Sequence, residues 1–188
     1  MLEEDIPIAP GTVLRRLTAA HAAAFAAHVA HDLDHLAEFL PWPELTADTA
    51  GAARWLGAYE RREDARVVAA GIRQAGTLAG GGVLFHHEPV SAVVELGIWM
   101  GAQAQGTGLA TAACRALLAA ARRELGVERV VWQSAAGNAR SRRLAEKIGF
   151  SYEGTARSSL ALRGGRLDMD VLSLVGEEID RAYSDAFP

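Results

Sequence analysis

A glycine-containing segment at residues 103–110, QAQGTGLA, constrains the fold of this chain more than any other feature. It lies between an expected strand and a long expected helix, and its glycines, Gly106 and Gly108, let the backbone approach a ligand closely. The first amides of a helix have no partners inside it, and together with the helix dipole they favour an anion. The segment therefore predicts a pyrophosphate site, with an ordinary turn into a helix as the alternative.

Two other phosphate-binding patterns do not fit the segment. A P-loop requires G-x-x-x-x-G-K-[ST], and no lysine follows these glycines. A dinucleotide fingerprint requires G-x-G-x-x-G, and Thr111 occupies the position of the third glycine. The segment is therefore neither of these two motifs.

Hydrophobic periodicity predicts an α/β protein whose strands and helices follow one another along the whole chain. Pro41 and Pro43 separate the first two helices, and a tight turn at residues 74–76 joins two of the strands. The strand–helix–strand order in the second half predicts a mixed, partly parallel sheet. The expected strands are 13–17, 66–73, 77–85, 91–100, 129–134, 150–162 and 166–175, and the expected helices are 18–40, 48–63, 107–125 and 138–148.

Length and composition favour a single folded domain over residues 1–188 in the cytoplasm. Hydrophobic residues make up 50% of the chain and charged residues 22%, which is far from the composition of disordered segments. The net charge of -4 argues against nucleic acid or an anionic membrane as partner. We find no secretory signal and no apolar run of about 20 residues that could span a bilayer. The sole cysteine, Cys114, cannot form an internal disulfide.

Three motifs, in order, resemble those of the GNAT acetyltransferases. Gln103, Gly106 and Gly108 match the signature Q/R-x-x-G-x-G/A. Residues 138–150, followed by Glu153 and Gly154, are similar to the N-x-x-S-x-x-x-x-E-K-x-G-F and E-G pattern of the RimJ/RimL branch.

The third motif, HLAEFLPWP at residues 35–43, is similar to the L-x-x-W/F-L-P-W segment of the same branch. Enzymes of this branch acetylate the N-terminal amine of ribosomal proteins. The resemblance covers nearly the whole chain and implies an acetyl-CoA-dependent acyltransferase that uses no metal.

The resemblance also implies a fold and a cofactor site. The GNAT fold has a mixed sheet, here of about seven strands flanked by helices, in which the parallel strands 91–100 and 129–134 would splay apart around the pantetheine. Residues 18–65 would be a helical elaboration on the acceptor side. The family pattern assigns cofactor contacts to Ile98, Trp99 and Met100 for the pantetheine, to Gln105, Gly106, Thr107, Gly108, Leu109 and Ala110 for the pyrophosphate, and to Asn138 and Ser141 on the opposite side.

Glu95 is the candidate general base, because amine acetylation needs a neutral nucleophile and an N-terminal amine has a reference pKa near 8. It lies in the apolar run VVELGI, where burial would raise the pKa of a carboxyl group. The alternative is that strand alternation turns Glu95 to solvent or pairs it with an arginine.

Ser141 is the candidate hydrogen-bond donor to the leaving thiolate. Many GNAT enzymes have a tyrosine seven residues after the asparagine, but this position is Ala145 here. A helical turn after Asn138 could bring the Ser141 hydroxyl near the sulfur, whereas the alternative is a hydroxyl that bonds the preceding turn of its own helix. A strand N–H near residues 98–100 could hold the oxyanion.

Three histidines, His28, His31 and His35, are spaced to share one helical face. Zinc ligation there is conceivable, but no other ligand cluster completes the set, so surface or acceptor-site histidines are favoured. His86 and His87 lie at an expected strand end and are interpreted as polar loop residues.

Aromatic and basic residues offer further candidates. The tryptophans could line an acceptor cleft, although core packing is more common. The basic cluster could hold a 3'-phosphate or form a solvated helix face. These residues are Trp42, Trp55 and Trp99, and Arg140, Arg142 and Arg143.

The leading hypothesis is direct acetyl transfer from acetyl-CoA to a primary amine, with the Ser or Ala N-terminus of a protein or peptide as acceptor. The alternatives are a small amine such as an antibiotic or polyamine as acceptor, succinyl-CoA as donor, and a non-catalytic acyl-CoA sensor. A homodimer is compatible with the family.

Overall fold

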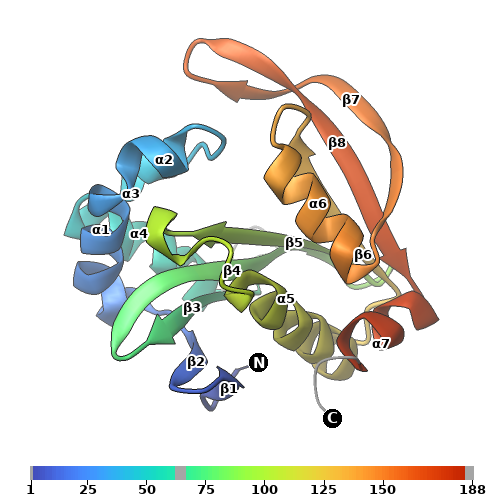
Figure 1. Ribbon diagram of the computed structural model, residues 1–188, viewed down its shortest axis with the longest axis horizontal. Helices are drawn as coiled ribbons and strands as arrows, with labels where there is room; N and C mark the ends of the chain where they lie inside the picture. Colours follow the sequence, from blue (N-terminus) through green and yellow to red (C-terminus); the bar gives the residue numbers. More distant parts are fainter. Residues whose placement is uncertain (1, 62–66, 185–188) are drawn as a thin grey trace.

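The computed structural model describes residues 2–61 and 67–184, which are organised by one eight-stranded sheet (Figure 1). The strand order is β1-β2-β3-β4-β5-β6-β8-β7, and every neighbouring pair is antiparallel except β5 and β6. The mixed, partly parallel sheet predicted from the sequence is confirmed. The strands are β1 (Ile6–Ala9), β2 (Thr12–Arg16), β3 (Val68–Gln74), β4 (Thr77–Glu88), β5 (Val93–Met100), β6 (Arg129–Ala135), β7 (Ser151–Leu162) and β8 (Gly165–Val175).

Helices cover both faces of the sheet (Figure 1). One face packs on α5, α6 and α7, and the other on the helices of the N-terminal half. The described helices are α1 (Ala22–His31), α2 (Leu33–Ala37), α3 (Pro43–Thr46), α4 (Thr49–Glu60), α5 (Leu109–Ala120), α6 (Ala139–Ile148) and α7 (Glu177–Ser184). None of them is long and apolar enough to cross a membrane.

Strand β5 shows how the two faces divide. Val94 and Leu96 are buried in the core that includes α5, whereas Trp99 belongs to the core formed with α1 and α4. Because successive side chains of a strand point to opposite faces, Glu95 lies on the same face as Trp99. Glu95 therefore faces the side of the N-terminal helices.

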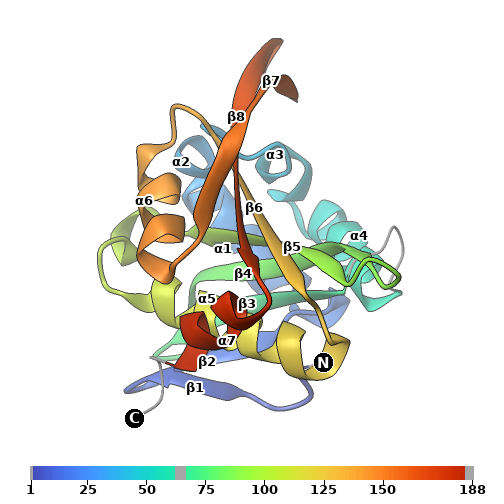
Figure 2. The ribbon, with the colours of Figure 1, turned by 90° about the vertical axis from the view of Figure 1, so that its right-hand side faces the viewer.

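The parallel strands β5 and β6 pair over three residues and then separate. Their register ends at the pair Glu95 and Val131, while β5 continues beside β4 as far as Met100 and β6 continues beside β8 as far as Ala135. Figure 2 shows β6 running away from β5 above this point. The splayed parallel pair that the family resemblance implied is confirmed, and we call this opening the split.

Glu153 of β7 forms hydrogen bonds to β6 and β8 below the split. Its carboxylate accepts hydrogen bonds from the Arg129 guanidinium of β6 over 2.8 Å and from the Ser173 hydroxyl of β8 over 2.7 Å. These two hydrogen bonds lower the pKa of Glu153 to about 2, and the bond from Arg129 has the larger effect. The strand β7 has a bulge between Tyr152 and Gly154. The Glu153–Gly154 pair thus has a structural role in this fold.

The prediction of one continuous helix over residues 18–40 is wrong. A 3₁₀ turn at Ala19–His21 leads into α1, and Asp32 separates α1 from α2 with a non-helical backbone (φ -110°, ψ 23°). Aspartate competes with helical hydrogen bonds and so favours helix ends.

Other bounds also differ from the sequence expectations. The helix expected at 107–125 begins at Leu109 and ends in a π-helical turn at Ala121–Leu125. The elements β1, α3 and α7 were not predicted; β1 contains Pro7, which an edge strand tolerates. Residues 62–66, where one helix was expected to end and one strand to begin, lie outside the described residues.

Candidate active site

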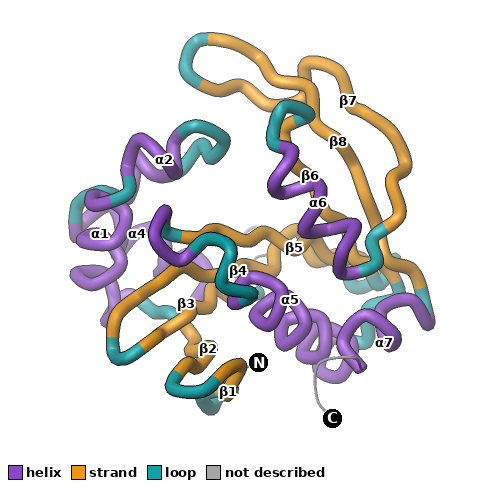
Figure 3. Tube along the Cα trace, viewed as in Figure 1, coloured by secondary structure: helices purple, strands orange, loops and turns teal. Residues whose placement is uncertain are grey.

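The glycine loop lies between β5 and α5 (Figure 3), and its backbone geometry suits an anion. Gly106 and Gly108 adopt left-handed backbone angles of φ 75° and 84°, and a Cβ at either position would meet no atom within 4 Å. Backbone conformation, rather than crowding, is therefore what requires glycine here. The first bond into α5 runs from the Ala112 amide to the Gly108 carbonyl, so the amides of residues 109–111 lack partners within the helix.

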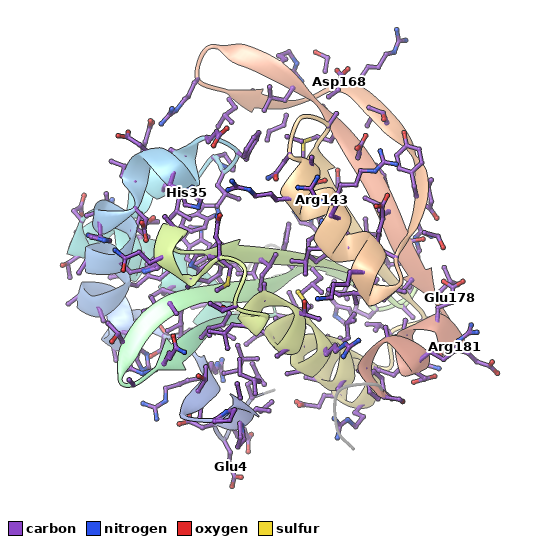
Figure 4. All side chains as sticks on the ribbon, viewed as in Figure 1. Glu4, His35, Arg143, Asp168, Glu178 and Arg181 are labelled. Atoms are coloured by element: carbon purple, nitrogen blue, oxygen red, sulfur yellow. The ribbon has the colours of Figure 1, made fainter. Side chains whose placement is uncertain are left out.

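Side chains of the loop connect it to its surroundings. The Thr107 hydroxyl donates to the Ala104 carbonyl over 2.7 Å, which closes the turn before α5. The Gln105 side chain lies 2.7 Å from His35 Nε2 of α2, and its carbonyl oxygen accepts from Arg140 of α6 over 2.7 Å. Gln105 therefore links the N-terminal helices to α6. Figure 4 shows His35 on α2 and Arg143 on α6 on the two sides of the split.

The helical face expected for three histidines does not form, because Asp32 ends α1 before His35. His28 packs against Gly101 at the end of β5, and burial lowers its pKa. His31 is exposed, and His35 contacts the glycine loop. Within residues 2–61 and 67–184, no group of three or more His, Cys, Asp or Glu side chains is arranged to hold a metal ion.

Glu95 lies at the fork of the split, as the last residue of β5 that pairs with β6. Its side chain is 13% exposed, and burial raises the pKa of its carboxyl group. Hydrogen bonds partly oppose this shift: His86 Nδ1 lies 3.1 Å from Oε2, and the Gln133 amide donates to the same oxygen over 3.1 Å. The two alternatives considered from sequence, full exposure and pairing with an arginine, are not what the structure shows.

His86, which was interpreted from the sequence as a polar loop residue, lies within β4 and contacts Glu95. It lies beyond Phe85, in a β-bulge between Phe85 and Glu88, where the register of β4 on β5 shifts. Its backbone is left-handed at φ 52°, and this turns the imidazole toward Glu95. Residue 85 pairs with residue 95 in the sheet, which brings residue 86 close to Glu95. This pairing depends on the register of the two strands, so the sequence alone carried no signal for the contact.

Asn138 and Ser141 lie at the start of α6, across the split from β5. The Asn138 side chain caps the helix by accepting from the Ser141 amide over 3.1 Å. The Ser141 hydroxyl accepts from the buried Trp132 indole over 3.0 Å and does not bond the preceding turn of its own helix. Because a hydroxyl also has one hydrogen to donate, Ser141 keeps its donor free for another acceptor. Ala145, one turn later, is fully buried.

If Ser141 donates to the leaving sulfur, as the family resemblance implies, Ser141→Ala should lower kcat for acetyl transfer about tenfold, the effect of losing one hydrogen bond, with little change in the Kd of acetyl-CoA. The substitution also leaves the Trp132 N–H without its acceptor, so thermal unfolding should be followed alongside. Ser141→Thr, which keeps a hydroxyl, is the matched control. Equal turnover by wild type, Ser141→Ala and Ser141→Thr would show that the Ser141 hydroxyl takes no part in the reaction.

The tryptophans gather with other aromatic residues on the face of the sheet that carries Glu95. Trp42 and Trp55 have ring centroids 5.1 Å apart, and the centroid of Trp42 lies 5.5 Å from that of Trp99. Phe25 lies among them and is fully buried. Trp99 is 4% exposed, and its indole nitrogen is buried without a hydrogen-bond partner among the described residues.

The three arginines of α6 do not act as one cluster. Arg140 bonds Gln105 at the glycine loop. Arg142 binds Glu146 of its own helix and Asp170 of β8, and its guanidinium lies 4.4 Å from the centre of the Tyr152 ring. Arg142 is therefore a structural residue, and the 3'-phosphate role considered from sequence stays a prediction for the other two.

The split, the glycine loop at the end of β5 and the carboxylate at the fork define a protein of the GNAT class. The chain belongs to this family: the sequence model described as "Acetyltransferase (GNAT) domain" matches residues 12–151. Over 115 residues the chain is 37% identical to the "Putative ribosomal N-acetyltransferase YdaF" of Bacillus subtilis (strain 168). This alignment covers 61% of the chain and 63% of the relative, so it spans somewhat less than two thirds of that protein.

Solved structures share the fold over nearly the whole chain. A crystal structure of a "Probable acetyltransferase" has a TM-score of 0.85 and 29% identity, covering 93% of this chain and 98% of that one. The structure of RimL, described as a ribosomal L7/L12 α-N-protein acetyltransferase in complex with coenzyme A, also has a TM-score of 0.85, with 22% identity over 93% of this chain and 99% of that one. The GNAT fold predicted from the motifs is confirmed.

Proposed function

We propose that this protein transfers an acetyl group from acetyl-CoA to the N-terminal amine of a protein or peptide that begins with Ser or Ala. The observation that carries the proposal is the separation of β5 and β6 beyond Glu95, next to a loop whose amides are free to bind an anion. The unpaired amides of residues 109–111 and the open space at Gly106 and Gly108 fit a pyrophosphate. Backbone groups of residues 98–100 lie on the β5 edge that β6 leaves, and so are available to a pantetheine.

Glu95 and Ser141 divide the proton transfers between the two sides of the split. Glu95 takes one proton from the acceptor ammonium, and the neutral amine forms the C–N bond at the thioester carbonyl carbon. As the C–S bond breaks, the nitrogen passes its second proton to the Ser141 hydroxyl while that hydroxyl gives its own proton to the sulfur, so that Ser141 ends the step unchanged. The net products are the amide, the free thiol and one proton, held by Glu95.

The acceptor would enter on the face that carries Glu95 and Trp99, between the helices of residues 18–61 and the β7–β8 hairpin. The hairpin reaches toward α2 and α3 (Figures 1 and 2), and Arg163 at its turn lies 3.6 Å from Glu44 of α3. A cavity of about 130 Å³ lies at this meeting point, lined by Ala37, Leu40, Pro41, Glu44, Ala161, Leu162 and Arg163. A cavity of this size suits the end of an extended chain better than a folded surface.

The names of two relatives favour a protein N-terminus as acceptor. The relative from Bacillus subtilis is named as a ribosomal N-acetyltransferase, and the name of the RimL structure specifies a ribosomal protein. The net charge of -4 suits a basic ribosomal protein, and it suits an aminoglycoside or a polyamine equally well.

Steady-state turnover of acetyl-CoA with a panel of Ser- and Ala-initiated peptides and small amines tests the proposal. We expect turnover with the peptides and loss of turnover when their N-termini are blocked. Turnover of an aminoglycoside or a polyamine alone would assign a small amine as acceptor and contradict the peptide assignment. Faster turnover with succinyl-CoA than with acetyl-CoA would identify a larger acyl donor. Tight binding of acetyl-CoA by calorimetry, without transfer to any amine, would indicate a sensor.

A further inference from the structure

A hydrogen-bond path leads from the fork of the split to solvent. Glu95 is 13% exposed, whereas the His86 side chain beside it is 68% exposed. The two side chains meet through His86 Nδ1 and Glu95 Oε2, 3.1 Å apart. The pair therefore places one titratable group inside the split and a second one at the surface.

The two oxygens of Glu95 have different surroundings. Both His86 and Gln133 bond to Oε2, and no side chain or backbone group of the described residues bonds to Oε1. Oε1 is therefore the atom available to an acceptor amine, while Oε2 is held between β4 and β6. A proton received at one oxygen of a carboxylate leaves the other in contact with the imidazole.

The backbone at His86 is shaped for this contact at an energetic cost. A non-glycine residue with a left-handed backbone is strained, and β-bulges often re-aim a side chain next to an active site. The φ of 52° and the register shift of β4 occur together at His86. Phe85, the residue that pairs with Glu95, packs its ring against the imidazole, with centroids 4.6 Å apart.

Two other charged groups near these strands are engaged elsewhere, whereas Nε2 of the neighbouring His87 is buried without a hydrogen-bond partner among the described residues. Glu88, at the end of β4, accepts from the Val90 amide over 3.1 Å. Arg129, at the start of β6, is bound to Glu153. From β4, β5 and β6, the side chains that face the Glu95 carboxylate through hydrogen bonds are thus His86, which can titrate, and Gln133, which cannot.

We infer that His86 is the proton exit of this enzyme, an inference that rests on the proposed function. Each turnover leaves one proton on Glu95. The carboxyl group turns so that its protonated oxygen faces the imidazole, and the proton passes from Glu95 to His86 Nδ1 while the imidazolium releases the proton of Nε2 to water, which returns Glu95 to its basic form. Exchange of the remaining ring proton with water then restores the tautomer with a free Nδ1 before the next turnover, since the His86 side chain is exposed. The exchange needs no reactant other than water. His86 acts through Glu95 and is a proton-relay residue.

His86→Gly tests the inference, because glycine accepts the left-handed backbone and leaves room for free imidazole. We expect kcat at pH 7 in dilute buffer to fall about tenfold and to recover when imidazole is added, with no change in the Kd of acetyl-CoA. His86→Gln should lose similar activity without recovery, because its side chain fills the space. In both variants the dependence of kcat on pH should differ from that of wild type, because the His86 imidazole is absent.

Ala75→Gly is the matched control, since Ala75 has a similar backbone angle, φ 48°, in the distant β3–β4 turn. It should relax similar strain and leave kcat unchanged. Wild-type activity in His86→Gly, or a loss that imidazole does not restore, would overturn the relay while leaving the transferase in place. Absence of acetyl transfer by the wild-type protein would instead overturn the proposed function and the relay together.

Discussion

Glu95→Gln is expected to lower kcat for acetyl transfer by about two orders of magnitude at pH 7, because removal of a positioned general base typically costs this much or more. The amide keeps nearly the same shape and can still accept from Gln133, but it cannot take a proton from the acceptor. Steady-state rates with a Ser-initiated peptide measure the loss. Calorimetry should give an unchanged Kd for acetyl-CoA, because the glycine loop is not altered.

The same substitution has the opposite expected effect on stability. Burial raises the pKa of Glu95 above its reference value of 4.5, so the fold favours the protonated form. A group with a raised acidic pKa costs stability as pH rises above the unfolded value, and the wild-type protein carries this cost at pH 7. Glu95→Gln should therefore unfold at an equal or higher temperature than wild type at pH 7, with a smaller difference at pH 4.

Kinetics and stability together separate a catalytic from a structural role. Lower activity with undiminished stability is the outcome expected for a base kept in an unfavourable environment. A Glu95→Gln protein that turns over normally, or that loses activity only because it unfolds, would contradict the assignment.

The parts of the site that sequence could predict are those set by local rules. The glycine loop was recognisable because the left-handed angles at Gly106 and Gly108 and the start of α5 depend on neighbours in the chain. The separation of β5 from β6 followed from the family resemblance carried by that loop. The Asn138 cap is also a local feature of α6, but it was not predicted: the family pattern assigned Asn138 a cofactor contact, which stays a prediction.

The parts that sequence could not predict depend on strand register and on packing between elements. The contact of His86 with Glu95 requires a bulge in β4, and one residue of slip would turn the histidine to the other face. The bond from Trp132 to Ser141 joins β6 to α6, and it is found in place of the local bond that was the alternative considered for Ser141. Three histidines of suitable spacing failed to share a face because one aspartate ended the helix.

Gly108→Val is expected to weaken coenzyme A binding about 30-fold. A β-branched residue at φ 84° costs roughly 2 kcal/mol, and this cost must be met whenever the loop adopts the binding geometry. The free variant can relax away from that geometry, which turns the amides of residues 109–111 from the pyrophosphate. Titration calorimetry with coenzyme A measures the effect, and desulfo or dephospho analogues locate it on the diphosphate if they lose affinity in the same ratio.

Gly76→Val provides a control with nearly the same backbone. Gly76 has φ 83° in the β3–β4 turn, and a Cβ there would also meet no atom within 4 Å, so the two substitutions impose similar strain on the chain. Only Gly108 lies at the start of α5, where the backbone amides have no helical partner. Gly76→Val should therefore lose stability without losing affinity for coenzyme A. If both variants bound coenzyme A as wild type does, the loop would not be the diphosphate site, and the proposed acetyl transfer would lose its structural basis.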